Sequence, residues 1–357
     1  MKRCILVVNP GSTSTKFALY EEKDLLFEKN LPHSVKELSG FSRISDQFSF
    51  RKKLIMNELE KRGVDLESIK VVVGRGGLLK PIPSGIYKVN DAMKSDLLNS
   101  DRGEHASNLG GLIADDIAAD LPSALAYIVD PVVVDEMDDI ARYAGHPAFS
   151  RISIFHALNQ KAVARMYAST IGRNYEDINL IVAHMGGGIS VGAHRRGKVV
   201  DVNNGLNGDG PFSPERSGGL PAAQLVDLCF SGEKSKEEVH KMLIGQGGLV
   251  AYLQTNDFRE VCNRAQEGDI TALALQEALS YQVGKEIGAL GAVLKGRVDA
   301  IILTGGMAYQ KSHTDYISDM VSHLAEIVLF PGEDELWALA FNGLMALDGE
   351  AEVKEYH

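Results

Sequence analysis

Two short loops rich in glycine and hydroxyl side chains are the residues in this sequence best suited to chemistry on a phosphate. The first covers residues 9–16, Asn-Pro-Gly-Ser-Thr-Ser-Thr-Lys, and follows the apolar run 5–8. The second is the triple glycine 186–188, which follows the apolar run 180–183 and His184. Such loops present backbone N–H groups and hydroxyls at close range, as phosphate binding requires. We predict that both loops contact phosphate; for the first, a plain turn is the alternative, because Asn-Pro and Gly-Ser are good turn formers.

Neither loop has the sequence context of the common nucleotide-binding fingerprints. A Walker loop needs Gly-x-x-x-x-Gly-Lys-Ser/Thr and a following helix, but the first loop lacks this pattern and residues 17–20 alternate like a strand. A dinucleotide-binding fingerprint also needs a helix after its glycines. Residues 189–194 instead alternate apolar and polar side chains, and Arg196-Gly197 marks a hairpin turn. The sequence therefore predicts β-turn-β phosphate loops and disfavours a dinucleotide-dependent dehydrogenase.

Arginine and histidine side chains lie next to such loops. Arg75 and Arg216 are each in a glycine-rich segment, where a ligand can approach the guanidinium closely. The planar guanidinium suits carboxylate and phosphate oxygens, although a solvated structural arginine fits the local sequence equally well. His184 directly precedes the triple glycine and is a candidate hydrogen-bond donor to a phosphoryl group, whereas a structural role is commoner for a histidine at a strand end. No histidine spacing matches a zinc pair.

Two carboxylates stand at the ends of predicted elements. Asp130 ends a buried strand before a proline, and Glu335 opens the last predicted helix. Their local contexts favour a strand-end turn residue and a helix N-terminal charge that the helix dipole stabilises. The surrounding residues alone therefore give neither carboxylate a chemical role.

The elements that must position these residues alternate between strands and helices. Strands are predicted from β-branched runs, and helices from apolar residues at helical spacing. The strands expected outside the two loop regions cover residues 70–73, 126–129 and 300–303. The expected helices cover residues 54–62, 108–119, 155–168, 222–230, 235–243, 272–294 and 335–347. This order predicts an α/β protein, and the repeated strand–loop–strand–turn–strand design predicts two duplicated domains.

The composition limits the class of protein further. The 357 residues leave room for two domains, and the net charge of −11 disfavours a general binder of nucleic acid or anionic membranes. The three cysteines are scattered and form no Cys-x-x-Cys pair, as expected in a reducing compartment. The N-terminal apolar run is too short for a signal peptide, and no run is long enough to span a bilayer. We therefore expect a cytoplasmic protein with no nucleic-acid or membrane partner.

A series of motifs covers nearly the whole chain. In order they are VVNPGSTSTK, GRGGLLKPIP, GEHASNLG, VDPVVVDEM, IFHALNQK, AHMGGGIS, DVNNGLNGDGPFSPERSGGLP, GQGGLVAYL and ILTGGMA. This ordered set resembles the acetate and butyrate kinase family, within the sugar kinase, actin and heat-shock chaperone ATPase superfamily. The resemblance implies two duplicated ribonuclease H-like (actin-like ATPase) domains around a nucleotide cleft. It places the first at residues 1–150, completed by the C-terminal helix 336–357, and the nucleotide-binding second at residues 151–335.

The same resemblance implies ATP- and Mg²⁺-dependent phosphorylation of a short-chain carboxylic acid to an acyl phosphate, by direct in-line transfer. Position by position, it implies catalytic roles for Arg75, Asp130, His156, His184 and Arg216. It implies contacts with ATP or ADP for Asn9, Ser12, Ser14, Lys16, Gly186, Gly187, Gly188, Gly305 and Gly306. It associates Mg²⁺ with Asn9 and Glu335, and it implies a homo-oligomer.

The sequence departs from the acetate kinase pattern at both loops. Acetate kinases carry Gly-Asn-Gly where residues 186–188 are Gly-Gly-Gly, and Asn-x-Gly-Ser-Ser-Ser where residues 9–14 read Asn-Pro-Gly-Ser-Thr-Ser. Residues 71–130 also differ, which favours a longer acid: butyrate is the expected substrate, with isobutyrate, acetate or propionate as alternatives. The alternative from another functional class is a non-catalytic protein of the same fold that switches with bound nucleotide. Such a protein has no carboxylate to bind, so this alternative gives the two loop arginines no role.

Overall fold

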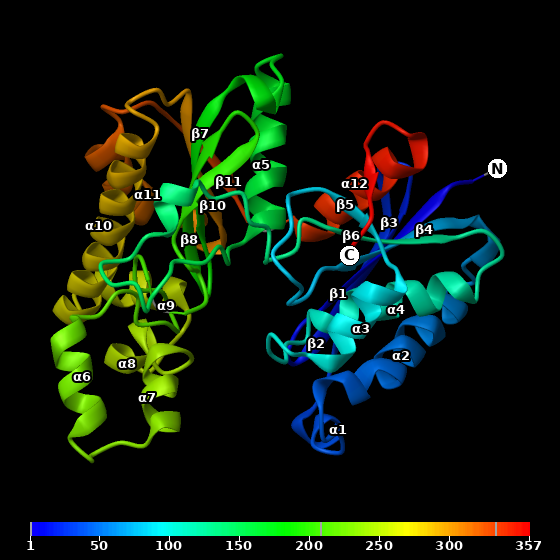
Figure 1. The fold of residues 1–357 in the computed structure, drawn as a ribbon, viewed down its shortest axis with the longest axis horizontal. Helices are drawn as coiled ribbons and strands as arrows, with labels where there is room; N and C mark the ends of the chain where they lie inside the picture. The colour runs from blue at the N-terminus through cyan, green and yellow to red at the C-terminus, as the bar shows by residue number, and fades with distance from the viewer. Residues whose placement is uncertain (1, 208, 333) are drawn as a thin grey trace. The chain divides into compact units, whose positions relative to one another are not determined.

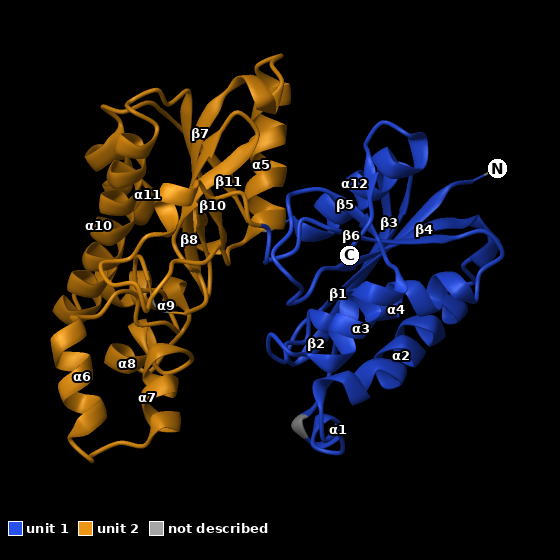
Figure 2. Ribbon diagram, viewed as in Figure 1, with its two compact units in different colours: residues 1–134, 334–357 blue, residues 135–333 orange. Residues whose placement is uncertain are grey.

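The computed structural model describes residues 2–207, 209–332 and 334–357. The chain divides into two compact units (Figure 2). Unit 1 comprises residues 1–134 and 334–357, and unit 2 comprises residues 135–333. Each unit has its own sheet and its own apolar core.

The boundary between the units corrects one expectation about domain organisation. It lies after residue 134 instead of at residue 150. Glu136 forms an ion pair with Lys161 at 2.6 Å, and the Asp138 backbone N–H donates to the Val200 carbonyl at 2.9 Å. These bonds attach the segment after residue 134 to unit 2, and they join residues too far apart in the sequence for a local pattern to reveal them.

Unit 1 is built on a seven-stranded mixed sheet (Figure 1). In spatial order its strands are β12 (Val353–Lys354), β5 (Ile86–Lys88), β6 (Leu125–Val129), β4 (Ile69–Arg75), β1 (Cys4–Pro10), β2 (Ser14–Glu21) and β3 (Asp24–Pro32). The strands β1, β2 and β3 form an antiparallel meander, and β4 and β6 run parallel to β1. Parallel strands end at the same edge of a sheet, so the residues that follow β1, β4 and β6 meet there.

Helices cover both faces of this sheet, because apolar side chains along the strands point alternately to one face and the other. The helices of unit 1 are α1 (Val35–Leu38), α2 (Phe48–Lys61), α3 (Asp91–Asn99), α4 (Asn108–Ala119) and α12 (Glu335–Asp348). On one face, Leu6 shares a buried cluster with Ile55 of α2 and Ile113 of α4. The next residue toward the N-terminus, Ile5, faces α12, where a Cβ at Gly343 would lie 3.2 Å from its side chain. The last long helix thus completes the core of the first unit.

Unit 2 contains a five-stranded mixed sheet. In spatial order its strands are β11 (Glu326–Pro331), β10 (Ala300–Gly305), β7 (Asn179–Met185), β8 (Ile189–Arg195) and β9 (Lys198–Val202). Here β7, β8 and β9 form an antiparallel meander, and β10 and β11 run parallel to β7. His184 near the end of β7 lies between Thr304 of β10 and Ser190 of β8.

Helices also cover both faces of this second sheet. They are α5 (Ala157–Thr170), α6 (Ala222–Phe230), α7 (Lys236–Leu243), α8 (Gly248–Leu253), α9 (Phe258–Gln266), α10 (Ile270–Val293) and α11 (Lys311–Val321). Ala164 of α5 packs with Leu180 on one face, and Val283 of α10 packs with Ile181 on the other. Helix α5 begins two residues later than predicted, so His156 directly precedes its first turn.

The two sheets share one strand order, which confirms the predicted duplicated α/β fold. The common order is β3-β2-β1-β4-β6 in unit 1 and β9-β8-β7-β10-β11 in unit 2. In both units a three-stranded meander comes first along the chain. Helices then connect it to two further strands, which run parallel to the first strand of the meander. Among the described residues, no helix has both the length and the apolar character needed to cross a membrane.

Candidate active site

The predicted residues Asn9, Arg75 and Glu335 lie together at one edge of the unit 1 sheet. Val8 of β1 pairs with Gly74 of β4, so the next residues, Asn9 and Arg75, end these strands side by side. Glu335 opens α12, and its Oε2 accepts a hydrogen bond from Asn9 Nδ2 at 2.7 Å and from Arg75 Nη1 at 3.0 Å. Arg75 Nη1 also donates to Asn9 Oδ1 at 3.3 Å. The Glu335 carboxylate is largely buried, so its charge is compensated mainly by this guanidinium.

The first predicted phosphate loop is a tight turn between β1 and β2. The Gly11 N–H donates to the Ser14 carbonyl at 2.8 Å, and Ser12 between them is exposed. Lys16 lies farther along β2, where its Nζ is 2.9 Å from Glu28 Oε1 on β3. The structure therefore brings the serines to the loop and places Lys16 in an ion pair on the sheet.

A buried arginine that the sequence analysis did not identify supports this loop from within the protein. Arg51 on α2 is fully buried, and its Nη1 donates to the carbonyls of Gly11 and Ser14 at 2.8 and 2.9 Å. Nη1 also lies 3.0 Å from Thr15 Oγ1, and Nε donates to the neutral amide of Gln47. Burial lowers the pKa of this guanidinium to about 10. Because its donors engage the loop's carbonyl oxygens, Arg51 adds positive charge beneath the residues expected to meet phosphate.

Asp130 follows β6 in unit 1 and has a strained backbone. Its φ is +36°, in a region that residues other than glycine rarely adopt. Its buried Oδ1 accepts hydrogen bonds from Ser84 Oγ at 2.6 Å and from the Gly85 N–H at 2.8 Å. A carboxylate held by two such donors has a fixed orientation, which suits the positioning of a neighbouring group.

In unit 2 the two predicted histidines form a stacked pair. The ring centroids of His156 and His184 are 3.8 Å apart, and the ring planes differ by 14°. His184 Nδ1 lies 2.8 Å from Asn159 Oδ1, and His156 Nδ1 lies 2.8 Å from Ser190 Oγ. The Asn159 oxygen only accepts, so His184 Nδ1 donates to it. Each ring is thus held by a side-chain partner and by the ring stacked on it.

The triple glycine is in direct contact with Arg216. A Cβ at Gly188 would lie 2.7 Å from Arg216 Cζ and 2.9 Å from the Gly205 carbonyl oxygen, so the guanidinium fills the space of a side chain at residue 188. Arg216 Nη1 donates to the Gly205 carbonyl, and Ser213 Oγ donates to the Gly187 carbonyl at 2.7 Å. Burial lowers the pKa of the Arg216 guanidinium. The loop and the arginine thus form one assembly that presents N–H donors to an anion.

A surface pocket of about 420 Å³ adjoins the triple glycine. Gly186 and Gly187 contribute from the loop after β7, and Gly306 contributes from the turn after β10. Gly305 has φ +91°, and a Cβ there would overlap the Met185 carbonyl oxygen and lie 2.7 Å from the Met185 backbone nitrogen and carbonyl carbon, so only glycine lets the two loops meet. The other lining residues, which the sequence analysis did not identify, are Pro214, Asn256, Asp257, Phe258, Arg259, Met307 and Gln310.

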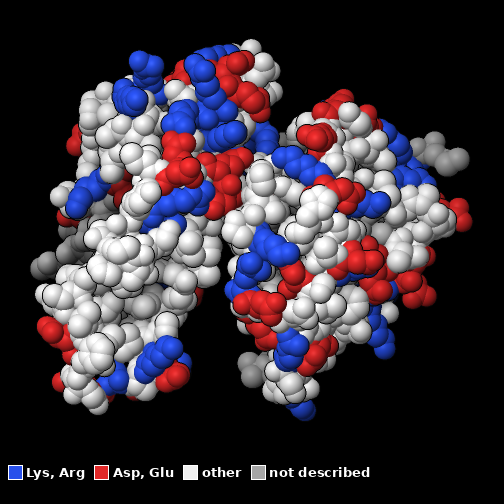
Figure 3. Space-filling model, viewed as in Figure 1, with Lys and Arg blue, Asp and Glu red and all other residues white. Residues whose placement is uncertain are grey.

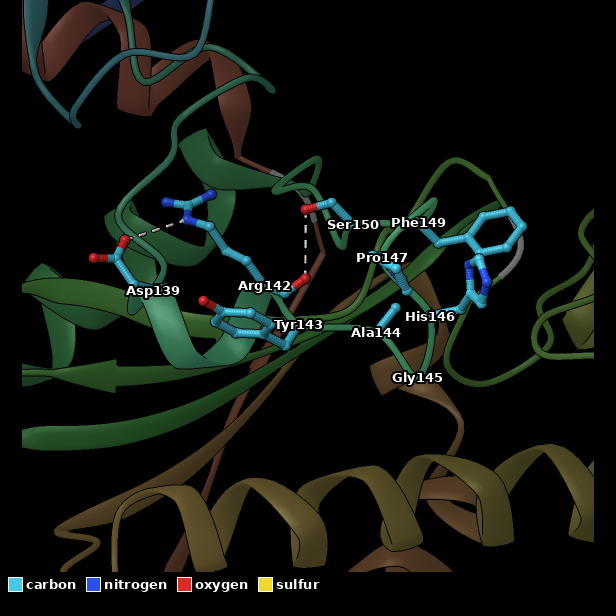
Figure 4. A pocket seen from close by; sticks show the side chains of 9 residues that line it. All are labelled: Asp139, Arg142, Tyr143, Ala144, Gly145, His146, Pro147, Phe149 and Ser150. Atoms are coloured by element: carbon cyan, nitrogen blue, oxygen red, sulfur yellow. Dashed lines mark hydrogen bonds and ion pairs between the residues drawn. The ribbon is translucent and has the colours of Figure 1, made fainter.

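A larger pocket of about 630 Å³ lies along residues 139–150 of unit 2 (Figure 4). Figure 4 shows the rings of Tyr143 and Phe149 beside it, and both side chains are mostly exposed. None of the predicted site residues is among the described residues that line this pocket. The smaller pocket is the better candidate for ligand binding, because two glycine loops and polar side chains converge on it.

Comparison with known sequences identifies close relatives of the whole chain. The sequence model of the acetokinase family matches residues 148–328. The chain is 55% identical to butyrate kinase 2 of Clostridium acetobutylicum over 356 residues, which cover 100% of both proteins. It is 54% identical to butyrate kinase 1 of the same organism over 352 residues, which cover 99% of both.

Solved structures with much lower sequence identity share the fold. The acetate kinase of Porphyromonas gingivalis superposes with a TM-score of 0.80 at 18% identity, covering 97% of this chain and 100% of that one. A propionate kinase from Francisella tularensis subsp. tularensis superposes with a TM-score of 0.74 at 19% identity, covering 95% and 98%. These likenesses confirm the predicted actin-like ATPase architecture.

Proposed function

This chain belongs to the acetokinase family, and we propose that it transfers the γ-phosphoryl group of MgATP to the carboxylate of butyrate. The products are butyryl phosphate and ADP, and the reaction is reversible. The observation that carries this proposal is the similarity of the whole chain to two butyrate kinases at 55% and 54% identity. The phosphate loops and the arginines beside them support the same chemistry.

The pocket beside the triple glycine supports nucleotide binding by unit 2. The Gly186 N–H donates to the Gly188 carbonyl at 3.0 Å and so closes the loop. A side chain at Gly187 would meet no atom within 4 Å, so the loop backbone there is open to contact with phosphates. The side chains of Asn256, Asp257 and Gln310 line the same pocket and can form hydrogen bonds with a ribose or a base. We therefore assign this pocket to ATP and ADP.

The oxygen atoms of Asn9 and Glu335 fit a magnesium ion that is held mainly by phosphates and water. Mg²⁺ prefers oxygen ligands, and kinases commonly hold it through one or two carboxylates together with substrate phosphates. In the part of the chain that the structure describes, no cluster of three or more His, Cys, Asp and Glu side chains could hold a metal by itself. When bound, Mg²⁺ offsets the charge of the phosphate oxygens.

The acceptor needs no general base, because a carboxylate is already ionised at neutral pH. The residues must instead hold two anions in line, which requires positive charge and hydrogen-bond donors. We assign this task to the guanidinium groups of Arg75 and Arg216, with His156 as a hydrogen-bond donor. His184, whose Nδ1 donates to the Asn159 amide oxygen, stacks on His156 and holds that ring in place. Asp130, held by two donors of its own, positions neighbouring groups.

The test is a comparison of four acids with the purified protein and MgATP. The acyl phosphate formed from acetate, propionate, butyrate or isobutyrate is trapped as the hydroxamate, and kcat/KM is measured for each. Each methylene in an apolar pocket contributes about 1–3 kcal/mol to discrimination, so we expect butyrate or isobutyrate to exceed acetate by roughly 10²-fold, with propionate between them. No product from any acid would refute the kinase proposal. Acetate as the best substrate would refute the assignment of butyrate alone.

We also propose that the protein is a homo-oligomer in the cytoplasm. The apolar helix α6 has no buried residue in the single chain, and its Phe230 is 86% exposed. Figure 3 shows a mostly uncharged surface over this helix, which a second copy would cover. Cys229 on the same helix is an exposed free thiol, which suits a reducing compartment. Light scattering tests the assembly: we expect an oligomer that Phe230→Asp weakens, and a monomeric wild-type mass at micromolar concentration would refute it.

A further inference from the structure

A chain of buried hydrogen bonds in unit 2 leads from Tyr175 to His156. Tyr175 Oη lies 2.6 Å from His194 Nδ1, and His194 Nε2 lies 2.9 Å from Gln160 Oε1. Gln160 Nε2 lies 2.9 Å from both the hydroxyl and the carbonyl oxygen of Ser190. Ser190 Oγ in turn lies 2.8 Å from His156 Nδ1. The three middle residues, Gln160, Ser190 and His194, are fully buried, so each of their polar atoms needs one of these partners.

The Ser190 carbonyl sets the direction of this chain. A carbonyl oxygen only accepts, so the atom of Gln160 that faces it is the amide nitrogen, and the amide oxygen faces His194. His194 Nε2 must then donate to that oxygen. Burial holds the pKa of His194 well below its usual range. In the neutral ring Nδ1 carries no proton, so it accepts from the Tyr175 hydroxyl.

The same reasoning fixes the proton on His156. The Ser190 hydroxyl accepts from Gln160 Nε2 at 2.9 Å and from the His156 backbone N–H at 3.3 Å, which occupies both of its acceptor positions. Its single proton is therefore donated to His156 Nδ1. The neutral His156 ring carries its own proton on Nε2, and that nitrogen is a hydrogen-bond donor.

Gly192 supports this arrangement independently. It lies within β8 and has no left-handed φ, so its backbone could accommodate any residue. A Cβ there would lie 2.5 Å from Gln160 Oε1 and 3.3 Å from His194 Nε2. The hydrogen bond between Gln160 and His194 thus occupies the space that a side chain on this strand would fill.

We propose that Gln160 and His194 are positioning residues that hold His156 in the tautomer with the proton on Nε2. In that form His156 donates a hydrogen bond to an anionic phosphoryl oxygen without first having to become charged. This inference rests on the proposed acyl kinase function, in which His156 meets the transferred group. A donor that is already oriented when charge develops in the transition state lowers the barrier without reorganisation.

Variants at residues 190 and 194 test the proposal by kinetics. His194→Leu removes the donor to Gln160, whereas His194→Gln can supply an amide N–H in place of Nε2–H. Ser190→Ala removes the last link directly and changes little volume. With MgATP and butyrate we expect kcat to fall about ten- to a hundredfold in His194→Leu and Ser190→Ala, the range found when partners that orient metal-bound histidines are removed, with both KM values nearly unchanged. His194→Gln should recover most of the turnover.

The tautomer itself is measured by ¹⁵N NMR on the wild-type protein. We expect the His156 signals to show a protonated Nε2 and an unprotonated Nδ1, and this proton to redistribute in Ser190→Ala. A proton on Nδ1 in the wild type would overturn the proposal. So would a folded His194→Leu or Ser190→Ala variant with a lower melting temperature and wild-type kcat. Failure of the wild type to form any acyl phosphate would refute the proposed function, while the spectrum would still decide the tautomer.

Discussion

Replacing Gly188 with alanine tests whether the triple glycine sets the position of Arg216. The new Cβ would lie 2.7 Å from Arg216 Cζ and 2.9 Å from the Gly205 carbonyl oxygen, whereas such atoms rest about 3.5–4 Å apart. The Gly205 carbonyl prevents the methyl group from moving aside, so the guanidinium must shift by about 1 Å. A misplacement of this size costs on the order of 10²-fold in rate when the group positions the reacting atoms. We therefore expect kcat of Gly188→Ala to fall by about 10²-fold.

The neighbouring Gly187→Ala variant is the matched control. A Cβ at Gly187 would meet no atom within 4 Å, and the residue has no left-handed φ. Gly187 lines the proposed nucleotide pocket, so a methyl group there narrows the pocket and leaves Arg216 in place. We expect this variant to raise the KM for MgATP and to leave kcat within a few-fold of wild type. Initial rates over a range of MgATP and butyrate concentrations, with melting temperatures to verify folding, separate the two effects.

The double variant Gly188→Ala/Arg216→Ala decides how residue 188 acts. If the methyl group acts by displacing Arg216, the double variant is no slower than Arg216→Ala alone, because two changes to one interaction are not additive. A wild-type kcat in Gly188→Ala would refute the reasoning, since the guanidinium would then tolerate displacement. A double variant much slower than Arg216→Ala would show that residue 188 contributes separately.

Three further perturbations concern buried titratable side chains. Glu335→Gln removes the carboxylate that bonds Arg75 and that we assign to Mg²⁺. We therefore expect a higher Mg²⁺ concentration to be needed for the half-maximal rate. An unchanged dependence of the rate on Mg²⁺ would contradict that assignment. Arg51→Met leaves the carbonyls of the first loop without a donor. We therefore expect the free energy of unfolding in urea to fall by about 1–3 kcal/mol and the KM for MgATP to rise. An unchanged KM would show that the loop keeps its shape without Arg51. Burial lowers the pKa of His313 from 6.5 to about 3, so the unfolded chain takes up this proton first and stability falls as pH drops below about 6.5. The loss is about 3 kcal/mol at pH 4; urea unfolding at pH 7 and pH 4 measures it, and equal acid sensitivity in His313→Gln would assign it to other groups.

Local sequence patterns predicted most elements of both units. The helix predicted at residues 108–119 is α4, and the strand–loop–strand–turn–strand pattern around residues 180–202 is the meander of β7, β8 and β9. These features could be predicted because helical and strand periodicity, glycine turns and β-branched runs act between residues close in the chain. Family resemblance added the proposed roles of side chains whose local sequence was uninformative, such as Asp130.

The tertiary structure decided which groups share a site. Arg51 aligns with the buried Ile55 and Leu59 on one face of α2, but the predicted helix began at residue 54 and so left the arginine outside it. Asn9 and Glu335 bond although 326 positions separate them in the chain, and no local pattern relates a strand end to a helix start so far away.

The hydrogen bonds that determine the tautomer of His156 also required three dimensions. Gln160 and His194 lie on a helix and a strand that are adjacent only after the sheet forms. Sequence periodicity specifies which side chains are buried, but burial alone does not identify the partner of a buried polar atom. That choice follows from close packing, in which a residue as small as Gly192 determines whether Gln160 and His194 can meet.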